Sequence, residues 1–125
     1  MTTTILYQPV GSQELALIEA TGWREFPPHA PGRQAFHPLT NEALARKMAQ
    51  NACHKLDELG FVTRFAVLNA FLARYERKVV GARQHEEYWI PAEDLPAFNA
   101  AIDGRIEIIG AYGIDGDRSD MLANF

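Results

Sequence analysis

The chain has 125 residues, 47% of them hydrophobic, which suits one compact domain with a buried core. Its 16 acidic and 12 basic residues are spread without long blocks and give a formal net charge of -4, which argues against a nucleic-acid surface. Cys53 is the only cysteine, so an internal disulfide and a paired-cysteine metal site are excluded. No signal pattern is visible at the start and no apolar run is long enough to cross a bilayer, so we expect a cytoplasmic protein.

The first forty residues predict a strand, a helix and a long loop. Residues 5–7 favour a short strand that Pro9 closes. Ser12 can cap the following helix, and Gly22 supplies its stop. Residues 23–38 are rich in proline and aromatic residues and are long for a connector, so we expect a binding loop.

A second helix follows, capped by Thr40 or Asn41 and ended by Gly60. Its expected apolar stripe contains Leu44, Ala45, Met48, Ala49, Ala52, Cys53 and Leu56. Cys53 is expected to be a small buried hydrophobic residue there and not a nucleophile.

The rest of the chain alternates strands with short helices. Strands are predicted over 61–67, 75–80, 84–90 and 105–112, and helices over 93–102 and in a short turn that Asn69 caps and that runs through Ala73. Strands that follow one another closely favour antiparallel pairing, so the expected class is α+β, with small mixed or antiparallel sheets flanked by helices. One domain is expected over 1–112, followed by a loose tail over 113–125.

The segment from Gln84 to Pro91 contains the strongest candidates for catalytic and binding residues. In an extended conformation, alternation places His85, Glu87 and Trp89 on one face of the strand. That face offers an acid, an imidazole and a large aromatic plane, although edge strands also use such residues to stay soluble. The histidines have no metal-ligand spacing and no phosphate-binding glycine loop is present, so we expect no metal site and no P-loop or dinucleotide fingerprint.

These segments resemble the ADP-ribosyltransferase fold. The matching features are Leu6-Tyr7-Gln8 at the end of a first strand, a helix ended by glycine, Phe36-His37-Pro38-Leu39-Thr40 before an alanine-rich helix, and a glutamate followed by three apolar residues and a proline. Glu87, followed by Tyr88-Trp89-Ile90-Pro91, occupies the position of the catalytic glutamate in that pattern. Residues 4–112 are also similar to small bacterial proteins described as ADP-ribosylation/crystallin J1.

The resemblance implies a transferase that binds NAD, releases nicotinamide and passes ADP-ribose to a protein or small-molecule acceptor. Glu87 would stabilise the developing positive charge on the ribose, and His85 would orient or deprotonate the acceptor. The implied NAD-binding residues are Tyr7, Gln8, His37, Arg64 and Trp89.

Two departures from the pattern leave alternatives open. The family usually has histidine or arginine where this chain has Gln8, and it usually lacks a histidine at the position of His85. Glu86 is a second candidate for the catalytic carboxylate, although the spacing to Pro91 favours Glu87. The alternatives are a non-catalytic binding module of the immunity or antitoxin kind, and a structural domain whose loop over 23–38 fills the cleft.

Overall fold

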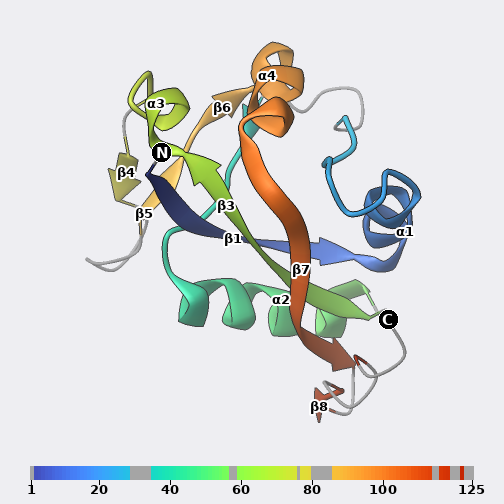
Figure 1. Ribbon diagram of the computed structural model, residues 1–125. Helices are drawn as coiled ribbons and strands as arrows, with labels where there is room; N and C mark the ends of the chain where they lie inside the picture. The colour runs from blue at the N-terminus through green and yellow to red at the C-terminus, as the bar shows by residue number, and fades with distance from the viewer. Residues whose placement is uncertain are drawn as a thin grey trace.

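Figure 1 shows a computed structural model of the chain. The structure describes residues 2–28, 35–56, 59–75, 77–79, 86–113, 116–118 and 122, with side chains described for all of these except 35, 52–56, 77–79 and 86. The residues 29–34 of the expected binding loop, together with Gln84 and His85, therefore lie outside the described residues.

The centre of the molecule is a curled antiparallel sheet. Its strands are β1 (Thr3–Gly11), β3 (Gly60–Leu68), β7 (Ile102–Gly113) and β8 (Gly116–Asp117), in the order β1-β3-β7-β8. Two smaller antiparallel pairs join β2 (Ala35–Phe36) to β6 (Ile90–Pro91) and β4 (Arg77–Val79) to β5 (Glu86–Tyr88). The expected α+β class with antiparallel sheets and flanking helices is confirmed.

The two faces of β3 pack against different parts of the molecule. Phe61, Phe65 and Val67 are buried in the main core, and Thr63 is buried on the same face. This is the alternation that the sequence predicts, and Arg64 faces the other way. The main core also holds side chains from the helices α1 (Ser12–Ala20) and α4 (Leu95–Ala100), while α2 (Glu42–Leu56) covers part of the opposite face.

The helix α2 lies closer to the sheet than the large side chains of its expected apolar stripe would allow. Asn41 caps it, because the Leu44 N–H donates to the Asn41 side chain at 2.9 Å. Ala45 and Ala49 are fully buried, whereas Met48, expected on the inner stripe, is 42% exposed. The expectation for Met48 is wrong because small side chains face the sheet and bring the helix backbone too near to leave room for methionine.

The strand β1 is longer than predicted, because it runs through Pro9 to Gly11. Since β1 is an edge strand of the central sheet, a proline whose nitrogen faces outward removes no bond to β3. Ser12 is the first helical residue of α1, not its cap, which is Gly11. Gly22 ends that helix as expected, with φ of 78° and a bond from its N–H to the Glu19 carbonyl.

Short helices close the chain reversals. They are α3 (Asn69–Leu72), in which Asn69 is the first helical residue and Leu68, not the expected Asn69, is the cap, and the 3-10 turn η1 (Ala92–Asp94) before α4. Within the segment 113–125, β8 pairs with β7, the Arg118 N–H donates to the Ala111 carbonyl, and Leu122 packs against the main core.

A substitution at Gly60 tests how closely α2 approaches β3. A Cβ atom at this position would lie 2.5 Å from the Ala49 carbonyl oxygen, which belongs to the helix backbone. We therefore expect Gly60→Ala to lower the free energy of unfolding by about 1–3 kcal/mol, as overpacking does. Gly110→Ala is the comparison, because there the obstructing atom is the end of the Arg46 side chain, which can shift more easily than helix backbone although it donates to Tyr112 and Ile109, and a urea melt should show the smaller loss. Equal stability of Gly60→Ala and the parent protein would contradict this packing.

Tyr75 gives a prediction about pH. Its hydroxyl donates to the Asp94 carboxylate at 2.7 Å, and burial, followed by this bond, raises its pKa to about 12. Because the folded-state pKa lies above the ordinary value, the contribution of Tyr75 to stability is complete below pH 10 and is lost as the pH rises through about 12. Urea melts should show Tyr75→Phe less stable than the parent by about 1–2 kcal/mol at pH 8, with a smaller difference at pH 11. A difference that grows with pH would refute this.

Candidate functional site

Three segments that are distant in sequence meet beside the outer edge of β1. Tyr7 and Leu39 exchange both backbone hydrogen bonds, each 2.8 Å long, and Leu39 forms a second antiparallel bridge to Glu87. Directly paired residues point to the same face, so Tyr7 and Glu87 lie on one face with Leu39 between them. The two backbones are about 10 Å apart across these two pairings.

Glu87 is held by two aromatic side chains. Among the described side chains it is the one buried charged group, with 8% of its surface exposed. The Trp89 indole N–H donates to Glu87 Oε1 at 2.6 Å, and His37 Nδ1 lies 3.5 Å from the same oxygen. The rings of His37 and Trp89 stack with centroids 4.7 Å apart and planes 20° from parallel. We call Glu87, His37 and Trp89 the Glu87 cluster.

Neighbouring apolar residues explain why these three side chains converge. Tyr88 and Ile90 alternate with Glu87 and Trp89 and are buried in the main core, which directs the cluster to the opposite face. Phe36 is fully buried and pairs with Ile90, while the Tyr88 N–H donates to the Pro38 carbonyl. The alternation predicted for this segment is therefore confirmed for its described residues, but the single strand predicted over 84–90 is divided into β5 and β6, with Trp89 between them.

The cluster leaves half of the carboxylate available. Both described contacts of Glu87 end on Oε1, so within the described part of the chain Oε2 has no bonded partner. Trp89 is 43% exposed and the His37 side chain 39% exposed, so a ligand can reach the cluster from solvent. A fixed, buried carboxylate with one open oxygen beside exposed aromatic rings suits an uncharged hydroxyl or a positively charged group.

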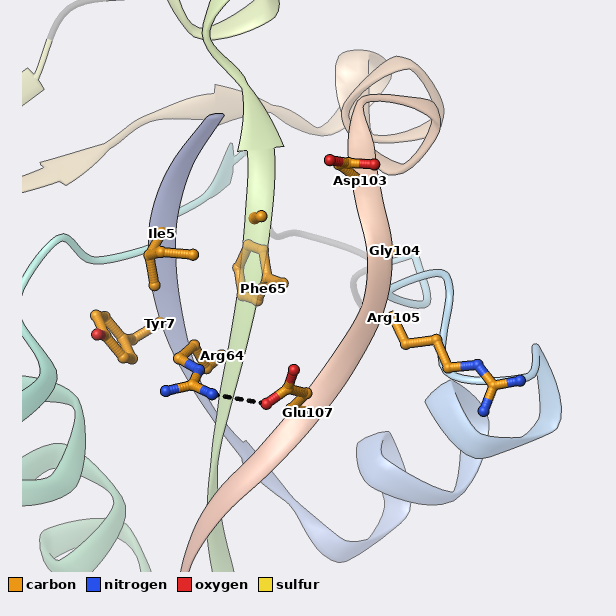
Figure 2. Close-up of a pocket in the computed structure, with 9 residues that line it drawn as sticks. Ile5, Tyr7, Arg64, Phe65, Asp103, Gly104, Arg105 and Glu107 are labelled. Carbon is orange, nitrogen blue, oxygen red and sulfur yellow. Dashed lines mark hydrogen bonds and ion pairs between the residues drawn. The ribbon is translucent and has the colours of Figure 1, made fainter. Parts of the chain in front are cut away.

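A hollow of about 340 Å³ lies on the same face of the sheet, next to Tyr7. It forms over Ala66 and Gly104, where the side chains are small or absent. Figure 2 shows Arg64 reaching across the face to Glu107, while the Arg105 side chain points away from Arg64. The hollow and the Glu87 cluster are thus on opposite sides of the Tyr7–Leu39 pair.

The remaining predicted site residues are not brought together. Gln8 points to the main-core side of β1, away from Tyr7, and its Oε1 is buried without a hydrogen-bond partner. Arg64 is paired with Glu107 at 2.8 Å, and this bond raises its pKa. His85 and the Glu86 side chain lie outside the described residues.

The sequence did not indicate the part played by Leu39. It appears there as one apolar residue between Pro38 and Thr40, and nothing in the local pattern predicts a bridge to two separate strands. Asp103 and Glu107, which line the hollow, were also not predicted as site residues, because Asp103 lies between the predicted helix and the predicted strand 105–112 and Glu107 lies within that strand without a motif beside it.

No group of three or more metal-binding side chains occurs in the described part of the chain. None of the described helices is both long and apolar enough to cross a membrane. Comparison of the chain with family models, with curated proteins and with solved structures gives no match.

Trp89→Phe tests the hydrogen bond that fixes Glu87. The change keeps an aromatic ring but removes the donor to a buried carboxylate, so we expect a loss of about 1–3 kcal/mol in the free energy of unfolding. In a Glu87→Gln background the same change should cost less, because the bond is then no longer charge-assisted. Chemical denaturation of the four proteins measures this coupling, and strictly additive losses would show that the bond contributes nothing.

Proposed function

We propose that this chain is an ADP-ribosyltransferase-like protein that binds NAD as a substrate at the Glu87 cluster. One observation carries the proposal: the three segments that resemble the family pattern, at Tyr7, at His37 to Leu39 and at Glu87, lie side by side at one edge of the sheet. A further support is that the glutamate of the pattern is buried and held in a fixed position.

The chemistry assigns Glu87 a specific task. When nicotinamide leaves, positive charge develops on the ribose carbon that was bonded to it. A preorganised carboxylate stabilises that charge more in the transition state than in the ground state, which accelerates bond breaking. Glu87 Oε2, which is open to a ligand, would bind the adjacent 2'-hydroxyl and hold the ribose against the carboxylate.

The other residues would bind parts of the same substrate. Trp89, which is 43% exposed and stacked on His37, would contact the nicotinamide ring, and Tyr7 lies on the same face one bridge beyond Leu39. Arg64 would contact a phosphate only after leaving Glu107. His85 is retained as the residue proposed to act on the acceptor, a protein or a small molecule. Gln8 faces the other side of β1, so we no longer assign it a direct contact with the ligand.

A second function is favoured by specific observations. Arg64 is occupied by an ion pair and Gln8 supplies no charge, while Arg105, which also lines the hollow, points away from Arg64 (Figure 2), so the described arginines do not converge on one diphosphate site beside Tyr7. These features favour a module that binds its partner without turnover. One measurement distinguishes the two functions: a transferase releases nicotinamide from NAD, and a binding module does not.

Glu87→Gln tests the catalytic assignment. The substitution preserves size and removes the negative charge, so nicotinamide release should fall by at least about a hundredfold, on the scale of losing one preorganised electrostatic group. Affinity for NAD should change far less, because the uncharged amide still accepts a hydrogen bond. Release is measured by chromatography and affinity by calorimetry, with a thermal melt of each protein.

The matched control is Glu19→Gln, an exposed carboxylate on α1. It should release nicotinamide at the parent rate. If Glu87→Gln does the same, Glu87 is not the catalytic carboxylate. If the parent protein binds NAD but releases no nicotinamide with any acceptor, the binding module is the better description.

A further inference from the structure

The hollow beside Tyr7 is lined by two rows of side chains on one face of the central sheet. Each row crosses β1, β3 and β7 through directly paired residues, which point to the same face. The rows are Ile5, Ala66 and Asp103, and Tyr7, Arg64 and Glu107. They lie next to the part of the sheet that α2 covers, and together they border the space of about 340 Å³.

An irregularity in β7 creates this space. Between the two rows β3 has one residue, Phe65, whereas β7 has three, residues 104–106, because the register shifts there. Extra residues bend a strand away from its regular path. A Cβ atom at Gly104 would meet no atom within 4 Å, so the space beside this residue is open, and the small side chain of Ala66 leaves the floor low.

Opposite charges lie at opposite ends of the hollow. Figure 2 shows Asp103 at one end and the pair of Arg64 and Glu107 at the other. Within the part of the chain that the structure describes, Asp103 has no hydrogen-bond or ion-pair partner. Arg64 donates to Glu107 through Nη2, which leaves the other guanidinium donors for a ligand. Arg105 also lines the hollow, but its side chain points away from Arg64.

This distribution of charge favours a ligand that carries both signs. A simple anion would meet the carboxylates of Asp103 and Glu107, and a simple cation would meet Arg64. The two rows are two residues of β3 apart, which is about 7 Å at the spacing of a strand. A carboxylate and an ammonium group joined by one carbon, with a hydrogen bond of about 2.9 Å at each end, span a comparable distance.

We propose that this hollow binds a free α-amino acid with an apolar side chain. Arg64 binds its carboxylate while it stays bonded to Glu107, and Asp103 binds its ammonium group. The apolar side chain covers Ile5, which is 45% exposed, and so removes apolar surface of both from water. The volume is at the lower end of the range of about 300–1,000 Å³ for ligand pockets, which suits a small molecule.

The inference goes beyond the proposed function. The Glu87 cluster lies on the other side of the Tyr7–Leu39 pair, and no step assigned to it uses Asp103 or Ala66. Substitutions at these two residues therefore test the hollow without changing the residues assigned to NAD.

Three probes with the same branched side chain test the requirement for both charges. They are leucine, isopentylamine, which lacks the carboxylate, and 4-methylpentanoate, which lacks the ammonium group. Titrations followed by NMR of the backbone amides should show saturable shifts with leucine, centred on residues 64–66 and 103–107. Each single-charge probe should bind at least about tenfold more weakly, because it loses one charge-assisted hydrogen bond.

Two variants examine the two features of the hollow. Asp103→Asn, at an exposed position, should weaken leucine binding at least about tenfold and leave the affinity for 4-methylpentanoate unchanged or higher. Ala66→Leu places a larger side chain in the hollow and should abolish saturable binding of leucine. The matched control is Glu19→Gln, an exposed carboxylate on α1, which should bind leucine as the parent does. Thermal melts identify any variant that has lost its fold.

The outcomes separate this inference from the proposed function. Absence of saturable leucine binding, equal affinities for leucine and either single-charge probe, or parental leucine affinity in Asp103→Asn would overturn the inference, whether or not the protein cleaves NAD. A tenfold preference for leucine over both probes that Asp103→Asn reduces would support it. If that preference is present but the parent protein releases no nicotinamide from NAD, the amino-acid site stands and the transferase function fails.

Discussion

The backbone pairing of Leu39 is the constraint on which the site depends. Leu39 exchanges two hydrogen bonds with Tyr7 and bridges to Glu87 on its other side, so it fixes the distance and the relative orientation of β1 and β5. Its side chain is almost completely buried with Ala45 and Ala49, which prevents the segment from turning over. Register shifts by one residue would move each side chain to the opposite face, so this pairing decides which groups can meet a ligand.

Along each strand, burial of the apolar neighbours also determines to which face a side chain points. Leu6 and Val10 are buried in the main core, and Gln8 between them must therefore point to that side, while Tyr7 points to the other. Likewise, burial of Tyr88 and Ile90 directs Glu87 and Trp89 to the opposite face. The free energy of burying these apolar side chains, about 1.5–3 kcal/mol each, is what holds a charged group at a partly desolvated position.

Alternation within one strand was predictable from the sequence, because it depends only on neighbours in the chain. The buried face of β3 and the common face of Glu87 and Trp89 were found in this way. Contacts between strands were not predictable, because register is set by packing over the whole sheet. The position of Leu39 and the pairing of Arg64 with Glu107 belong to this class. Met48 was placed wrongly because spacing locates a helix face but not its distance from the sheet.

In the function proposed above, NAD binds on the face of the sheet shared by Tyr7 and Glu87. The most direct measurement is a crystal structure of Glu87→Gln, grown with NAD so that the substrate stays intact. We expect the ribose next to nicotinamide to lie within hydrogen-bonding distance of residue 87 and the nicotinamide ring to lie against Trp89. A substrate bound on the Gln8 side of β1, or away from both Trp89 and residue 87, would contradict it.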